Sequence, residues 1–230
     1  MDKNCILIDK PTGWTSFDVC AKLRGMIRAE YSRRGIKPTK RQLRVGHAGT
    51  LDPFATGLLL IMTGDGTKGI DTLVKQDKHY EATLCLGATS TTGDPEGDIE
   101  QVSDREPSQR ELLEVMNSFI GRIEQVPPAY SAVKVDGKRA YKRARAGEVV
   151  DMPSRVVTIH SMKLVEYVYP YAKISVRVSS GTYIRSLASD IGNKLDTGAY
   201  CYGLRRTRIA DYDVANAVQP DQVEAARLLD

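Results

Sequence analysis

The sequence predicts an α+β or mixed-sheet fold rather than a doubly wound parallel sheet. Hydrophobic residues make up 41% of the 230 residues and charged residues 27%, which suits a packed core. Strand-like segments follow one another in hairpin-like succession more often than they alternate with helices. The length fits one large domain, or one domain with an inserted arm.

The first half of the chain begins with a short apolar strand at residues 5–8. A helix follows, with Thr15 or Ser16 as its N-cap, and runs to about Ala29. Residues 30–44 are strongly basic and poor in apolar side chains, so we expect an exposed loop. Apolar runs and alternation then predict a buried strand, a helix and a half-buried strand, at Leu58–Thr63, Ile70–Lys75 and Tyr80–Leu86 respectively.

The second half opens with a polar turn region at residues 89–107. Ser108 is the expected N-cap of a helix over Gln109–Ile120. Pro127 and Pro128 break the chain before a basic, tyrosine-bearing stretch at 129–150. The remaining expected elements are strands at about 156–168 and 172–179, a helix at Tyr183–Leu195 and a last strand near 204–214.

The four cysteines lie far apart and form no C-x-x-C pair, which argues against both a zinc site and a disulfide framework. The simplest interpretation is a reduced, cytoplasmic protein. The N-terminal segment has only a short apolar run before Asp9, so it resembles neither a signal peptide nor a membrane span.

Positive charge is concentrated in three places, although the formal net charge is only +4. Residues 24–44 carry eight Lys and Arg side chains against one Glu, and residues 131–147 carry six against one Asp. Arg205, Arg206 and Arg208 form a third cluster. A single cluster is as often a solvated face, but three clusters, one of them interleaved with tyrosines, favour a nucleic-acid partner.

A glycine-punctuated loop at Gly46–Gly57 is the sharpest local signal, because it presents His47 and Asp52 just before a buried strand. An isolated Leu-Asp-Pro is more often a structural turn. Gly64–Gly69 matches G-x-G-x-x-G and leaves a nucleotide-dependent oxidoreductase as an alternative, although no run of βαβ units follows. The histidines have no metal-ligand spacing, and no G-x-S-x-G motif is present.

Several motifs in register resemble the TruB-type tRNA pseudouridine synthases. His47–Pro53 resembles their catalytic motif, and the resemblance covers nearly the whole chain in order. The other matching segments are Asp9–Ser16, Asp77–Ala82, Pro127–Gly147, Gly181–Arg185 and Leu204–Thr207.

The resemblance implies a pseudouridine synthase fold: a central mixed, mostly antiparallel sheet flanked by helices, with an inserted thumb loop at about 125–150. It implies a single catalytic domain over residues 1–230, and the length leaves no room for the C-terminal PUA-type domain of many relatives. The expected substrate is the T-arm stem-loop of tRNA, modified at position 55 without a cofactor or metal. A monomer without an obligatory protein partner is expected.

The resemblance also assigns roles to residues. Asp52 is the expected nucleophile or its carboxylate equivalent, Arg185 its ion-pair partner and Tyr80 the residue that stacks on the uracil. His47 is expected to fill the stack that the flipped base leaves, and Leu204 to form an apolar wall. Further expected substrate contacts are Lys10, Lys134, Lys138, Arg139, Tyr141, Arg145 and Arg205.

Two alternatives stay open at this point besides the oxidoreductase. The fold could serve a non-catalytic module that binds or folds tRNA, although Asp52, Tyr80 and Arg185 stand in their motif context. The basic segment 30–44 is longer than in the family, and we expect it to contact tRNA phosphates.

Overall fold

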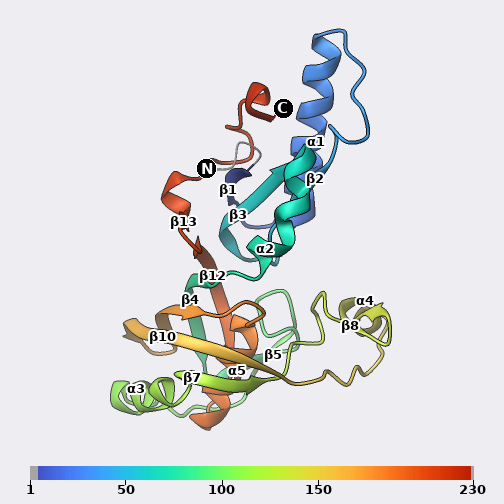
Figure 1. Ribbon diagram of the computed structural model, residues 1–230. Helices are drawn as coiled ribbons and strands as arrows, with labels where there is room; N and C mark the ends of the chain where they lie inside the picture. Colours follow the sequence, from blue (N-terminus) through green and yellow to red (C-terminus); the bar gives the residue numbers. More distant parts are fainter. Residues whose placement is uncertain (1–4, 229–230) are drawn as a thin grey trace. The chain divides into compact units, whose positions relative to one another are not determined.

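The computed structural model describes residues 5–228, so Met1–Asn4 of the N-terminal segment lie outside the described residues. The chain forms two compact units, one of residues up to Tyr80 with those from Arg205 onward, the other Glu81–Leu204. The boundary falls within the residue ranges of strands β4 (Lys78–Leu86) and β12 (Ala199–Ile209), both labelled in Figure 1. The expectation of a single domain stays a prediction.

The sheet of the first unit is centred on strand β3, Thr56–Thr63, which is buried along almost its whole length. Strand β1 (Cys5–Lys10) and strand β2 (Val45–His47) pair with it antiparallel, and β12 pairs with it in parallel through Arg205 and Arg206. Strand β13, Tyr212–Asp213, pairs antiparallel with β12. The apolar run of β3 thus became the buried strand that the sequence predicts, and β2 was not foreseen.

Helix α1 covers Ser16–Arg33, so it ends four residues beyond the predicted Ala29. A capping box fixes its start, since Thr15 and Asp18 exchange hydrogen bonds. Its end is a Schellman motif at Gly35 (φ 68°), in which the Ile36 amide donates to a carbonyl of the last turn. The basic run at residues 30–44 predicts a loop and therefore an earlier helix end. Gly35, which lies within that run, marks where the helix stops.

The apolar face of α1 forms the core of this unit. Its buried residues pack with residues of β1 and β3 into one cluster, including Val19, Leu23, Ile27, Leu59 and Ile61. Burial of such side chains contributes about 1.5–3 kcal/mol each, which explains why the helix forms despite its polar composition.

The glycine run Gly64–Gly69 forms a 3₁₀ helix (η1) that leads into the short helix α2, Ile70–Val74. A dinucleotide site instead needs a glycine turn that opens a long crossover helix. The run is therefore a structural turn, and the oxidoreductase alternative loses its main support. The predicted helix at Ile70–Lys75 is confirmed to within one residue.

The second unit contains a sheet with the strand order β12, β4, β11, β10, β7. Strand β10 pairs antiparallel with both of its neighbours. The bounds of the added strands are Gly121–Gln125 for β7, Arg155–Val168 for β10 and Tyr171–Val178 for β11. The mixed, mostly antiparallel α+β fold is confirmed, although the last strand begins at Ala199 and ends at Ile209 rather than spanning 204–214.

Helices α3 (Gln109–Ser118) and α5 (Ile184–Lys194) belong to the second unit. Ser108 caps α3 through a capping box with Glu111, as the sequence predicts. The described chain further contains short elements that no strong periodicity announces. They are β5 (Ala88–Ser90), β6 (Ile99–Gln101), β8 (Lys134–Val135), β9 (Lys138–Arg139), α4 (Ala140–Arg145), η2 (Val214–Asn216) and η3 (Ala225–Leu228).

The cysteines Cys5, Cys20, Cys85 and Cys201 are all buried, and none of these four described residues forms a disulfide. Within residues 5–228, no group of three His, Cys, Asp or Glu side chains is arranged to hold a metal ion. None of the helices described is both long and apolar enough to span a membrane.

Candidate active site

The Asp52 loop, residues 48–55, connects β2 to β3 in the first unit. The Asp52 side chain is half-buried, whereas Leu51 and Ala55 beside it are buried. The amide of Ala55 donates to the Asp52 carbonyl, which closes a tight backbone turn that begins at Asp52. The loop therefore presents one acidic side chain from a fixed backbone.

The start of the chain supports this loop from one side. The hydroxyl of Ser16 accepts a hydrogen bond from the Leu51 amide at 2.8 Å and donates to the Leu51 carbonyl at 3.2 Å. Lys10 is fully buried, and its Nζ donates to carbonyls including those of Trp14 (2.6 Å) and Pro53 (3.4 Å). Lys10 thus supports the loop backbone, while its contact with the substrate stays a prediction.

Arg206 supports the loop from β12. Its guanidinium is 1% exposed and donates to the carbonyls of Leu58 (2.7 Å), Gly49 (3.0 Å) and Thr50 (3.4 Å). The sequence predicts that Arg206 belongs to a basic surface cluster. That prediction is wrong, because the side chain is buried. Gly57 permits the close approach, since a Cβ there would lie 2.3 Å from the Arg206 carbonyl oxygen.

The buried charge of Arg206 also affects its neighbours. Burial, and then Arg206, lower the pKa of His47 at the end of β2. The same two causes lower the pKa of Lys78 to about 8, and the Lys78 side chain packs near Gly49. The protonated forms of His47 and Lys78 are thus disfavoured beside the buried charge of Arg206.

The other predicted residues of the first unit lie on its strands. Tyr80 is 7% exposed on β4. Arg205 on β12 is half-exposed and donates through both Nη atoms to the carboxylate of Asp9, at 2.9 Å each. This two-pronged bond orients the guanidinium.

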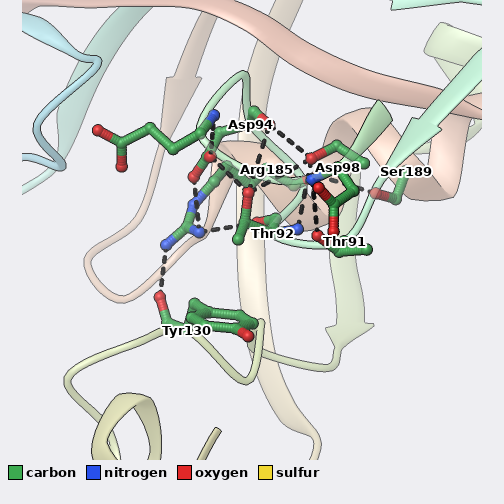
Figure 2. A network of polar contacts seen from close by, with 9 residues as sticks. Thr91, Thr92, Asp94, Asp98, Tyr130, Arg185 and Ser189 are labelled. Atoms are coloured by element: carbon green, nitrogen blue, oxygen red, sulfur yellow. Dashed lines mark hydrogen bonds and ion pairs between the residues drawn. The ribbon is translucent and has the colours of Figure 1, made fainter. Parts of the chain in front are cut away.

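Arg185 lies in the first turn of α5 in the second unit and is 3% exposed. Figure 2 shows the polar network around it. Its Nη1 donates to a carboxylate oxygen of Asp94 (2.9 Å) and to the Thr92 carbonyl (2.8 Å), and its Nη2 donates to the Tyr130 carbonyl (2.8 Å). The network joins α5, the turn after β5 and the start of the thumb loop.

Asp94 is the partner that sequence reasoning missed. Its other carboxylate oxygen accepts from the Thr92 hydroxyl (2.6 Å) and the Glu96 amide (3.0 Å), so this buried anion is well satisfied. An Asp between Gly93 and Pro95 reads locally as a turn residue, and no spacing pointed to Arg185. The predicted pairing of Arg185 with Asp52 stays a prediction.

Gln125 is a second residue without a sequence signal. It is 1% exposed, and its amide side chain accepts from the Tyr183 amide (2.8 Å) and donates to the Tyr183 carbonyl (3.0 Å). Tyr183 is the N-cap of α5, so Gln125 fixes the backbone directly before Arg185. A cavity of about 250 Å³ opens beside Arg185 and Tyr130 in this unit.

The predicted thumb loop contains a small hairpin, β8 with β9, followed by α4. Its turn is Asp136-Gly137, with both φ angles positive, as a tight hairpin requires. Basic side chains stand exposed on it, and the Arg145 guanidinium lies over the Tyr141 ring. The exposed basic residues are Lys134, Lys138, Arg139, Lys142 and Arg145. Leu204 is half-buried on β12.

The fold is that of a pseudouridine synthase, and comparisons with known proteins identify the family. The model of the TruB family pseudouridylate synthase N-terminal domain matches residues 33–184, and that of the tRNA pseudouridylate synthase B C-terminal domain matches 185–230. The chain belongs to the TruB family of pseudouridylate synthases.

Among known proteins, the chain is similar to the tRNA pseudouridine synthase B of Parabacteroides distasonis, with 44% identity over 95% of this chain and 91% of that protein. The corresponding protein of Phocaeicola vulgatus is 48% identical over 90% and 85%. A solved Cbf5-Nop10-Gar1 complex contains a chain 27% identical, with a TM-score of 0.67. That match covers 91% of this chain but only 49% of the Cbf5-complex chain.

Proposed function

We propose that this enzyme converts a uridine in the T-arm loop of tRNA, at position 55, to pseudouridine. The observation that carries the proposal is the match to tRNA pseudouridine synthase B, 44% identical across almost the full length of both chains. By contrast, the matched chain in the Cbf5 complex is only 27% identical, so the match to tRNA pseudouridine synthase B is the stronger support for a tRNA substrate.

The proposed reaction breaks the bond between C1′ and N1 of the uridine, rotates the uracil and forms a bond between C1′ and C5. The proton on C5 leaves and N1 gains one, so atoms and electrons balance without a redox step. Asp52 supplies the carboxylate that assists cleavage, either by attack on C1′ or C6 or by removing a ribose proton. Its loop, held by Ser16, Lys10 and Arg206, supports this role because the carboxylate needs a fixed position.

Other residues handle the base in this proposal. Tyr80 stacks on the uracil and assists loss of the C5 proton, and Leu204 forms an apolar wall. Arg185 pairs with Asp52 and keeps it ionised. Flipping the base out costs a few kcal/mol, and His47 fills the vacated stack. The lowered pKa of His47 supports this role, since a neutral imidazole stacks without a charge to solvate.

The thumb loop supplies the proposed grip on the T-arm. Its exposed cations carry the phosphate contacts and Tyr141 adds a ring for stacking. Arg205, oriented by Asp9, adds a further contact. We propose a cytoplasmic monomer that needs no cofactor and no obligatory protein partner.

The test is to incubate the protein with an unmodified tRNA transcript and to map pseudouridine at single-nucleotide resolution. We expect one modified position, in the T-loop, and no product on a transcript whose target uridine is replaced by cytidine. Modification elsewhere would overturn the site. Tight binding without any product would favour the alternative, a non-catalytic tRNA-binding module.

A further inference from the structure

We infer that a basic extension, residues 28–44, is a second RNA-binding surface that contacts tRNA phosphates independently of the thumb loop. The extension comprises the last turns of α1 and the loop that returns to β2 (Figure 1). The inference rests on the proposed function only in taking tRNA as the partner.

The extension has an ordered backbone. Arg24 on α1 donates to the carbonyls of Leu43 and Val45, at 3.2 Å each, which holds the returning strand against the helix. Thr39 and Gln42 exchange hydrogen bonds within the loop, and Leu43 packs on the core cluster of the unit. A segment fixed in this way presents its charges at defined positions.

Two carboxylates are engaged with some of the extension's cations. Glu30 accepts from Arg33 (2.6 Å) and Arg34 (2.8 Å), and these bonds lower the pKa of the Glu30 carboxyl to about 2. Arg41 pairs with Asp65. These contacts shape the extension and neutralise part of its charge.

Four cations remain. Arg28, Lys37, Lys40 and Arg44 are exposed and make no ion pair or side-chain hydrogen bond with any residue that the structure describes. Residues 28–44 hold seven basic side chains against one acidic, while the whole chain has a formal charge of +4. These like charges repel one another, and binding of a polyanion relieves the repulsion. The extension therefore fits the phosphate backbone of a nucleic acid.

The kind of contact follows from the side chains. The extension exposes no aromatic ring, since Tyr31, its aromatic residue, is 6% exposed and belongs to the core. The extension therefore offers no aromatic ring on which an unpaired base could stack. The extension should read phosphates alone, which raises affinity without adding sequence preference.

The experiment compares wild type with a variant carrying Arg28→Gln, Lys37→Gln, Lys40→Gln and Arg44→Gln. The dissociation constant for an unmodified tRNA transcript is measured between about 50 and 200 mM salt. We expect binding at least about 10-fold weaker and a log–log salt slope lower by about 3, because each of the four lost phosphate contacts removes roughly 0.7–0.9. The turnover rate at saturating tRNA should match wild type.

A matched control removes the same charge from the second unit, through Arg110→Gln, Arg122→Gln, Lys163→Gln and Lys173→Gln. An unchanged slope in the extension variant, or an equal change in the control, would overturn the inference. The extension would then be a solvent-exposed basic surface that does not contact tRNA. Pseudouridine mapping on the same samples separates the two proposals. A wild type that forms no product but shows the slope difference refutes the proposed function, not this surface.

Discussion

Replacing Arg206 by Met should lower the single-turnover rate roughly 100-fold while leaving the affinity for tRNA nearly unchanged. The substitution removes the donor of two short hydrogen bonds, to Leu58 and Gly49, and of a longer one to Thr50. A hydrogen bond to a charged group contributes about 1.5–3 kcal/mol, and the relieved desolvation of the guanidinium offsets part of the loss. We expect the free energy of unfolding to fall by about 3 kcal/mol.

The effect on turnover follows from the Asp52 loop. A shift of about 1 Å in a reacting group can cost roughly 100-fold in rate, and Arg206 fixes the carbonyls just before Asp52. Single-turnover kinetics at saturating tRNA should therefore show a loss of about that size. The pKa of His47, followed by NMR, should rise, because Arg206 contributes to lowering it.

The control is Arg208→Met on the same strand, which removes a surface pair with Asp213. Exposed pairs contribute little, so stability should change by less than about 1 kcal/mol. Wild-type turnover in the folded Arg206→Met protein would refute the reasoning, since the loop would then hold its position without this residue.

Further predictions concern the buried charges and one glycine. Asp94→Asn should lower stability by about 3 kcal/mol in urea unfolding and reduce turnover, because it removes the negative charge of the buried Arg185–Asp94 ion pair; unchanged turnover would separate this pair from catalysis. The pKa of Lys78, lowered to about 8 from 10.5, means that wild-type stability should rise as the pH increases between these values, since the unfolded chain binds the extra proton. Lys78→Met should abolish that rise, and an identical pH profile would contradict the assignment. Gly57→Ala should cost about 3 kcal/mol because of its backbone φ of 103° and the crowding Cβ. Gly25→Ala, in open space on α1, should raise the melting temperature slightly, and equal effects of the two would refute the argument.

Local signals predicted the elements whose information is local. Ser108 with Glu111 three residues later specifies a capping box, and the apolar run of β3 specifies a buried strand. The basic run predicts too early an end for α1, because the Schellman glycine, Gly35, and not the charge, sets where the helix stops. The three-residue strand β2 is too short for any periodicity to reveal.

The candidate site likewise contains residues that local motifs indicate and residues that only the folded structure reveals. Motif context singled out Asp52 and Arg185, but the residues that hold them depend on contacts between distant segments. Arg206 meets Gly49 across 157 positions, and Asp94 meets Arg185 across 91. Arg206 is buried, whereas Arg208, two residues further along the same strand, is exposed. The sequence of closely spaced arginines does not indicate which of them is buried.

The central claim is that the Asp52 carboxylate performs the chemistry of an RNA isomerase. The most direct measurement compares wild type with Asp52→Asn on an unmodified tRNA transcript, with product and dissociation constant measured on the same preparation. We predict that pseudouridine at position 55 is lost in the variant while the dissociation constant stays within about 3-fold of wild type. Turnover near the wild-type rate in Asp52→Asn would contradict the claim.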